Sequence, residues 1–173
     1  MTPSGWHQDA SGRDAGHDEM QAGVFRFMKH KEHTLPLDPG NGKVAVYKRV
    51  GIYFECPFFL AGRISTFVDV CLHFQSTEAD GYRQRDEALV CYEIKPRIYS
   101  VGAVVRQCHA TAHAVEQGSV HGGYVNPGFR KKPRVLVIPV VPADDPKVRL
   151  LAEFWWEVML WDAATSSCIP YEP

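Results

Sequence analysis

The chain has 173 residues, of which 45% are hydrophobic and 23% are charged, and its formal net charge at pH 7 is −1. These values fit one ordinary globular domain with a sizeable core, and the near-neutral charge excludes an overall basic surface. Any patch for an anionic partner must therefore be local. There is no signal peptide pattern and no apolar segment long enough to span a bilayer, so we expect a cytoplasmic protein without membrane contact.

The cysteines agree with this expectation, because they are odd in number, widely scattered and mostly inside apolar runs. A disulfide framework would need paired cysteines in an oxidising compartment, so we expect reduced thiols. The five are Cys56, Cys71, Cys91, Cys108 and Cys168.

The N-terminal segment, residues 1–17, is rich in Ser, Gly, Asp and His without periodicity, and predicts a flexible leader before a single domain over residues 18–173. Asp18 and Gln21 then have the spacing of a helix capping box. Glu19 falls in the first turn of this helix, where the helix dipole already favours an acid. The apolar residues that follow form one helical stripe: Met20, Val24, Phe27 and Met28.

Strand-forming residues come next. Residues 36–42 are rich in Pro and Gly and predict a turn or loop. Residues 43–56 predict one or two strands, with Gly51 at a bulge or turn between them. Pro57 and Gly62 bracket a short apolar connection to the following strand.

The strand predicted over residues 64–74 carries an isolated acid. Strand side chains alternate between faces, which predicts an apolar face made of Val68, Val70 and Leu72. Asp69 falls on the opposite face, with Cys71 and His73. A buried acid without a partner is costly, so Asp69 calls for an explanation.

The run from Leu89 to Pro96 predicts a buried strand that carries Glu93 and Lys95 on one face. An acid and an amine there are costly to desolvate unless they meet charged partners, and a divalent metal with a phosphate is a natural pair. A polar, turn-like segment joins this strand to the previous one, so the two are expected to be antiparallel neighbours. Asp69 and Glu93 would then share one face, within reach of one cation.

The C-terminal half begins with a helix from Ser100, its N-cap, to about Gln117. A Gly-rich loop over residues 118–130 follows, and residues 135–141 predict a fully buried strand with a proline near its end. A last helix is predicted from about residue 146 to 163. Its three tryptophans belong either to the core or to a face that binds a partner. Because they exceed what one packed side needs, we favour contact with a second copy of the chain or another protein. They are Trp155, Trp156 and Trp161.

The predicted order is helix, two or three strands, helix, strand and helix, with Asp69 on one strand and Glu93-Ile94-Lys95 on the next. In this respect residues 18–141 resemble the PD-(D/E)XK nuclease superfamily. That resemblance implies a restriction-endonuclease-like α/β fold, in which helices flank the mixed central sheet of an αβββαβ core.

The helix after the Glu-x-Lys strand adds to the resemblance. Gln107 resembles the glutamine of the Gln-x-x-x-Tyr motif in the RecB-like and phage-exonuclease branches of the superfamily. The match is incomplete, because Thr111 stands where that motif has Tyr and no Pro precedes Asp69.

The resemblance implies a metal-dependent nuclease. Phosphodiester hydrolysis needs charge neutralised at the phosphate and a water made nucleophilic, and Mg²⁺ or Mn²⁺ held by oxygen ligands can do both. Asp69, Glu93 and the carbonyl of Ile94 would provide such ligands, and Glu19 is the candidate for an extra carboxylate from the first helix. Lys95 would orient or help deprotonate the attacking water.

Nucleic acid is the expected partner. Gln107 and Arg106 would contact phosphate or support the acids, and a basic run would hold the backbone without reading sequence. This run consists of Arg130, Lys131, Lys132 and Arg134. DNA is expected, although nothing in the sequence separates it from RNA or an endonuclease from an exonuclease.

Plainer explanations stay open. Glu93 and Lys95 form a structural ion pair in one of them, Gln107 is a surface amide, and the basic run is a solvated loop. His109 and His113 have a spacing that suits zinc, but no Glu follows His109 and no Cys-x-x-Cys occurs. The rival function is a catalytically silent nuclease-fold module that binds nucleic acid or protein within a larger complex.

Overall fold

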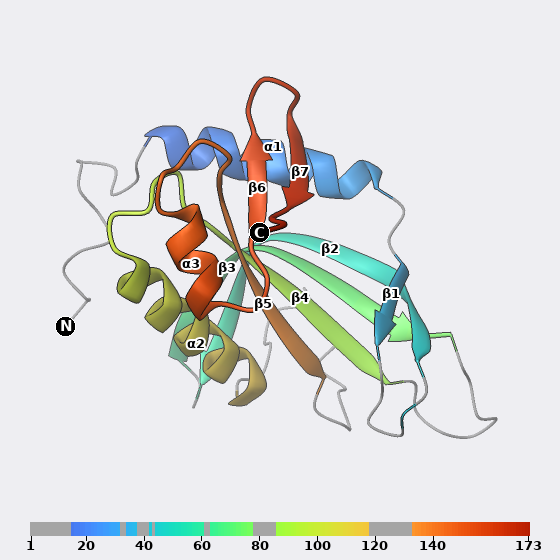
Figure 1. Cartoon of the computed structure of the whole chain (residues 1–173). Helices are drawn as coiled ribbons and strands as arrows, with labels where there is room; N and C mark the ends of the chain where they lie inside the picture. Colours follow the sequence, from blue (N-terminus) through green and yellow to red (C-terminus); the bar gives the residue numbers. More distant parts are fainter. Residues whose placement is uncertain are drawn as a thin grey trace.

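A computed structural model of the chain describes residues 15–31, 34–37, 42, 44–60, 63–77, 86–117 and 133–173. Within these ranges three helices and seven strands follow one another along the chain (Figure 1). In order they are α1 (Ala15–His30), β1 (Thr34–Leu37), β2 (Ala45–Leu60), β3 (Arg63–Ser76), β4 (Glu87–Ile94), α2 (Val101–Gln117), β5 (Arg134–Pro142), α3 (Val148–Phe154), β6 (Met159–Asp162) and β7 (Ser167–Pro170).

The strands form one mixed sheet in the order β1-β2-β3-β4-β5-β6-β7. Strands β1 to β4 are antiparallel in turn, β5 is parallel to β4, and β6 is parallel to β5 and antiparallel to β7. The segment that contains α2 makes the crossover that a parallel pair requires. The predicted α/β class, with helices flanking a mixed sheet, is therefore confirmed.

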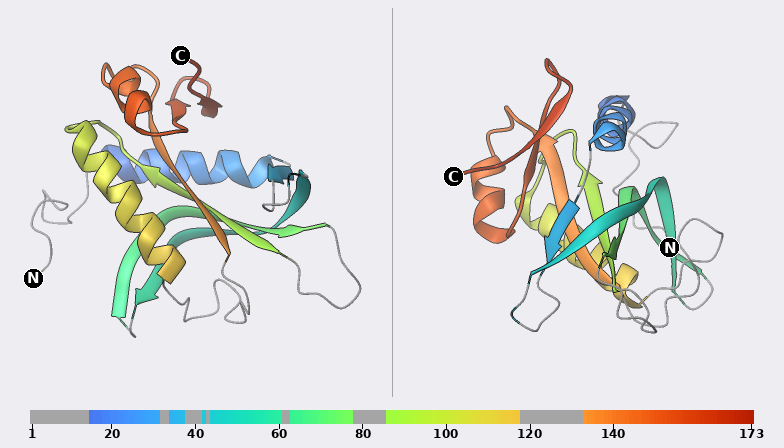
Figure 2. Two further views of the ribbon diagram at one scale, coloured as in Figure 1. Left: turned by 60° about the horizontal axis from the view of Figure 1, so that its bottom comes forward. Right: turned by 90° about the vertical axis from the view of Figure 1, so that its right-hand side faces the viewer.

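Helices α1 and α2 cover opposite faces of the sheet, each over its own core (Figure 2). The predicted stripe of α1 packs on one face, where Val24 is fully buried and Met28 almost so. Helix α2 packs Val104 and Cys108 on the other face. Its predicted bounds are confirmed, and its N-terminus has Ser100 Oγ accepting a hydrogen bond from the Ala103 N–H at 3.4 Å.

Strand β2 is a single long strand in which the alternation of side chains between the two faces of the sheet is interrupted partway along its length. A shift of register at Gly51 confirms the predicted irregularity there. Farther along, Phe54 packs edge-on against Phe25 of α1, whereas Cys56 lies in the core beneath α2. Residues two apart in a strand normally share a face, and the change occurs at Glu55, whose φ of 49° is left-handed.

In strand β3 the alternation of side chains is interrupted at the matching position. Val70 packs on the α1 side of the sheet and Val68 on the α2 side, so the prediction that both lie on one face is wrong. Asp69 stands between them and lies across from Glu55, because Phe54 pairs with Val70 and Cys56 with Val68. The far end of the β2–β3 hairpin consequently curls around α2 (Figure 2).

Some predicted boundaries were wrong. Helix α1 begins at Ala15, three residues earlier than expected, so residues 15–17 belong to the helix and not to a leader; residues 1–14 lie outside the described part. Gln21 is consequently buried within the helix and does not form a capping box. Strand β1 occupies Pro36 and Leu37, where a turn was expected, and β2 continues through Pro57 to Leu60.

The predicted last helix over residues 146–163 is wrong beyond Phe154, where α3 ends and the chain continues into the β6–β7 hairpin. Trp155 and Trp161 are buried in the core, and the Trp155 indole N–H donates to the Val137 carbonyl at 2.9 Å. Trp156 is 62% exposed. The tryptophans therefore do not form one helical surface, and contact with a partner protein stays a prediction for the exposed residues only.

All five cysteines are free and buried, as the sequence predicted. Among the described residues no helix is both long and apolar enough to cross a membrane.

Candidate active site

Strands β3 and β4 separate where the alternation of side chains in β3 is interrupted, and we call this separation the fork. Pairing of these strands ends at Val70 and Tyr92, whereas β4 stays paired with β5 as far as Ile94. At the fork the backbone N–H of Ile94 has no strand partner on the β3 side, and it donates instead to Asp69 Oδ2 at 2.7 Å. The acid that looked misplaced in an apolar strand thus replaces a missing backbone acceptor.

Two side chains of α1 hold Asp69 from the other side. Gln21 Nε2 donates to the Asp69 backbone carbonyl at 3.2 Å and lies 3.5 Å from Oδ1. His17 Nε2 lies 3.4 Å from the same Oδ1, and this hydrogen bond raises the pKa of His17. His17 and Gln21 are four residues apart, so one turn of the helix presents both to Asp69.

Glu93 is held by α2. Its side chain is 1% exposed, Oε2 accepts a hydrogen bond from Gln107 Nε2 at 2.7 Å, and Oε1 accepts one from the Thr111 hydroxyl at 2.8 Å. Lys95 Nζ lies 3.4 Å from Oε2. Burial raises the pKa of Glu93 to about 7, the charge of Lys95 opposes this rise, and the charge of Asp69 adds to it.

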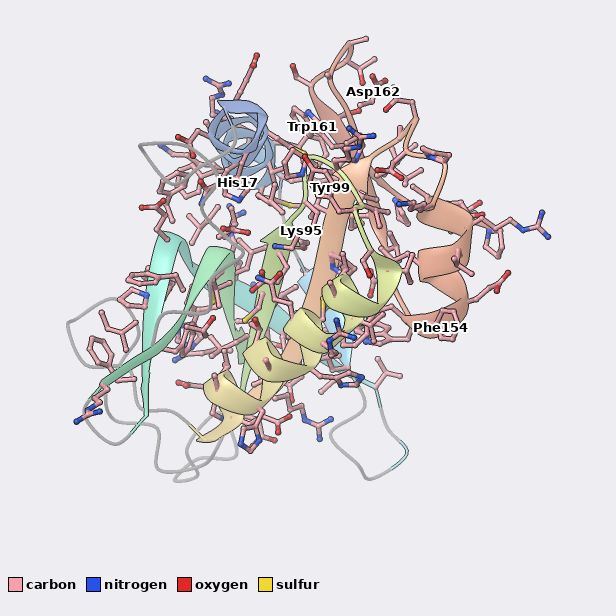
Figure 3. All side chains as sticks on the ribbon, turned by 90° about the vertical axis from the view of Figure 1, so that its left-hand side faces the viewer. His17, Lys95, Tyr99, Phe154, Trp161 and Asp162 are labelled. Atoms are coloured by element: carbon pink, nitrogen blue, oxygen red, sulfur yellow. The ribbon has the colours of Figure 1, made fainter. Side chains whose placement is uncertain are left out.

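The two acids therefore meet at the fork, Asp69 supported by α1 and Glu93 by α2. The prediction that they share one open face of the sheet was too simple, because the alternation of side chains is interrupted at Asp69. Figure 3 shows His17 and Lys95 on the same side of the molecule, by the end of β4. The side chains of Lys95, Asp69 and His17 are 12%, 17% and 20% exposed, so the fork is partly accessible to solvent.

The oxygen atoms at the fork suit a hard cation. The N–H and C=O of a strand residue point to the same neighbouring strand, so the Ile94 carbonyl faces the fork as its N–H does. The buried amide oxygens of Gln21 and Gln107, one from each helix, accept no hydrogen bond in the structure. Carboxylate and carbonyl oxygens are the ligands that Mg²⁺ or Mn²⁺ prefers, so Asp69, Glu93 and the Ile94 carbonyl could hold such an ion.

Other predicted residues are not brought to the fork. Glu19 is exposed, because two residues along a helix from His17 place it on the opposite side of α1. Arg134 pairs with Ala88, at the end of β4 away from Glu93. Arg106 is exposed on α2. The remaining basic residues, Arg130, Lys131 and Lys132, lie outside the described residues.

A zinc site is not supported, since His109 and His113 are both exposed. The described ranges contain no group of three or more His, Cys, Asp or Glu side chains placed to hold a metal ion, so a cation at the fork would need backbone or amide oxygens beside the two acids. Sequence reasoning missed His17, Gln21 and Thr111. The first had been assigned to the leader. Thr111 carries one usable signal, because it lies four residues after Gln107 and a helix presents both on the same side.

Comparison of the chain with protein-family models, with curated proteins and with solved structures gives no match. Function is therefore inferred from the geometry of the fork.

Proposed function

We propose that the chain is a metal-dependent nuclease of the restriction-endonuclease-like fold that hydrolyses phosphodiester bonds in DNA. The order α1, β2–β4, α2, β5 supports the αβββαβ part of this proposal. The observation that carries it is the meeting of Asp69, Glu93 and Lys95 at a solvent-accessible fork between two strands.

Asp69, Glu93 and the Ile94 carbonyl would hold the metal ion. When bound, Mg²⁺ or Mn²⁺ would neutralise charge on the phosphate and make water a better nucleophile. The buried Glu93 suits this role, because a carboxylate with a raised pKa gains more from a nearby cation than a solvated one does.

The chain's own groups would orient the reactants. Lys95 Nζ, held beside Glu93, would donate to the attacking water or to a phosphate oxygen and stabilise the negative charge that develops there. Gln107 and Thr111 fix both oxygens of Glu93, and His17 and Gln21 fix Asp69. We assign these four a positioning role, since each contacts one of the two acids.

Cleavage of linear, circular, single-stranded and branched DNA, with Mg²⁺, Mn²⁺ or EDTA, tests the proposal. We expect cleavage only with metal, and its loss in Asp69→Ala, Glu93→Ala and Lys95→Ala while circular dichroism stays native. Glu19→Gln is the matched control, an exposed acid of α1 that should leave the rate unchanged. Cleavage that survives Glu93→Ala would remove the mechanism.

The second candidate is a catalytically silent module that binds nucleic acid. It is favoured by the near-complete burial of Glu93, whose two carboxylate oxygens both have partners within the chain. Binding of DNA without cleavage of any form would decide for this module. The cytoplasmic location stays a prediction.

A further inference from the structure

The segment between Lys95 and α2 presents an aromatic ring to solvent. Tyr99 is 68% exposed, and the Arg97 guanidinium lies over its ring, 5.3 Å from the ring centroid. Figure 3 shows Tyr99 on the same side of the molecule as Lys95 and His17.

The backbone on each side of Tyr99 is firmly held. Ile98 is 1% exposed, and its N–H donates to Asp145 Oδ2 at 2.8 Å. Lys147 Nζ donates to the Tyr99 carbonyl at 2.8 Å, and the Lys147 N–H donates to Asp145 Oδ1 at 2.9 Å. The ring is thus presented by an ordered segment, so little conformational entropy would be lost when a ligand stacks on it.

Two cations lie directly beside Tyr99, which favours an anionic ligand. Arg97 lies over its ring and Lys147 Nζ donates to its backbone carbonyl. Two acids, Asp144 and Asp145, lie on the segment that contacts this loop, and both carboxylate oxygens of Asp145 accept hydrogen bonds from backbone N–H groups. An exposed ring with cations around it is the combination by which proteins bind unpaired nucleotides, where the ring stacks on a base and the cations contact phosphates.

We propose that Tyr99, with Arg97, is a stacking platform for an unpaired base, and that the substrate is single-stranded nucleic acid or nucleic acid with an unpaired segment at the site of cleavage. This inference rests on the proposed function. Tyr99 is four residues from Lys95, so their Cα atoms are at most about 14 Å apart. The stacked base therefore belongs to the strand within a few nucleotides of the phosphate at the fork.

A continuous duplex fits this platform poorly. Bases inside a duplex have both faces covered by their neighbours, so a protein ring stacks on them only after a base has been extruded, which costs free energy. An unpaired strand carries no such cost.

Fluorescence anisotropy with a short, labelled oligonucleotide in EDTA measures binding without cleavage. The probes are single-stranded DNA, single-stranded RNA, the matching duplex and a single strand whose residues near the centre lack bases. We expect Tyr99→Ala to weaken binding of the intact single strands by about tenfold, in the range for loss of one stacked base. Tyr99→Phe, which keeps the ring, should bind like wild type. Phe154→Ala is the matched control, since Phe154 is 63% exposed on α3 and should not affect binding.

The outcomes separate the platform from the nuclease. Equal binding by wild type and Tyr99→Ala, an effect as large on the duplex or the abasic strand, or the same loss in Phe154→Ala would each overturn the platform and leave metal-dependent cleavage standing. A tenfold loss of binding in Tyr99→Ala that is restricted to the intact single strands supports the platform. This holds even if no cleavage is found with Mg²⁺ or Mn²⁺, in which case the nuclease proposal alone fails. Loss in the DNA arm but not the RNA arm assigns the substrate to DNA.

Discussion

Replacement of Glu93 by glutamine should make the metal-free protein more stable above neutral pH. Because burial raises the pKa of Glu93 from 4.5 to about 7, the native state retains a proton that the unfolded chain releases. Stability therefore falls as the pH rises from about 4.5 to about 7. A tenfold change in a dissociation constant corresponds to about 1.4 kcal/mol, so the ionised, buried carboxylate costs about 3 kcal/mol at higher pH.

Glutamine can keep the same contacts. The Thr111 hydroxyl, which donates to Glu93, can rotate and accept from the new amide instead, and the amide oxygen can still accept from Gln107 and Lys95. The pKa of Glu93 already reflects the stronger hydrogen bonds and ion pair of the charged form, so their loss adds no separate cost. We therefore expect Glu93→Gln to be more stable than wild type by about 2–3 kcal/mol near pH 8.

Urea denaturation in EDTA across about pH 4.5 to 8 measures the difference. The gain should be present at the upper end and disappear at the lower end, where Glu93 is protonated in the native state. Glu116→Gln, which changes an exposed acid of α2, should show no such trend. The reasoning is refuted if Glu93→Gln is less stable than wild type at every pH, or if the gain does not depend on pH.

Three further outcomes follow from the same contacts. Mg²⁺ should raise the melting temperature of wild type at pH 8 but not that of Asp69→Asn, as scanning calorimetry can measure, because only the native state offers the site. Thr111→Val should lose about 1–2 kcal/mol of stability above pH 7 and less at pH 5, by urea denaturation, because the ionised Glu93 loses a hydrogen-bond donor. Gly23→Ala should lower the melting temperature despite a better helix propensity, because a Cβ atom there would lie 2.6 Å from the ring of the buried Trp161.

The sequence predicted correctly those elements whose apolar period and end-marking residues all lie within one short segment. Helix α2 has a cap at Ser100 and a full apolar stripe, and its bounds agree with the structure. Strand β4 is a β-favouring run closed by Pro96. In each case neighbouring residues alone supply the period and the boundary, so no distant contact is needed to interpret them.

The C-terminal segment shows why the same approach fails elsewhere. Its apolar residues suit a helix or a strand equally well, since short apolar runs do not have a distinctive period. The choice was made by β5, whose open edge offers backbone hydrogen bonds to Met159 and its neighbours, and by the core, which takes Trp155 and Trp161 from different elements.

The residues of the candidate site likewise fall into those that the sequence showed and those that only the tertiary structure showed. Asp69, Glu93 and Lys95 were evident from the sequence by itself, because charges in apolar strands are costly and so conspicuous. Their supports were decided only in the tertiary structure: Gln21 and Asp69 are 48 residues apart, and Thr111 and Glu93 are 18 apart. No local pattern shows that a helix will dock with one turn facing a particular acid, since that depends on how the sheet bends and where each helix comes to rest.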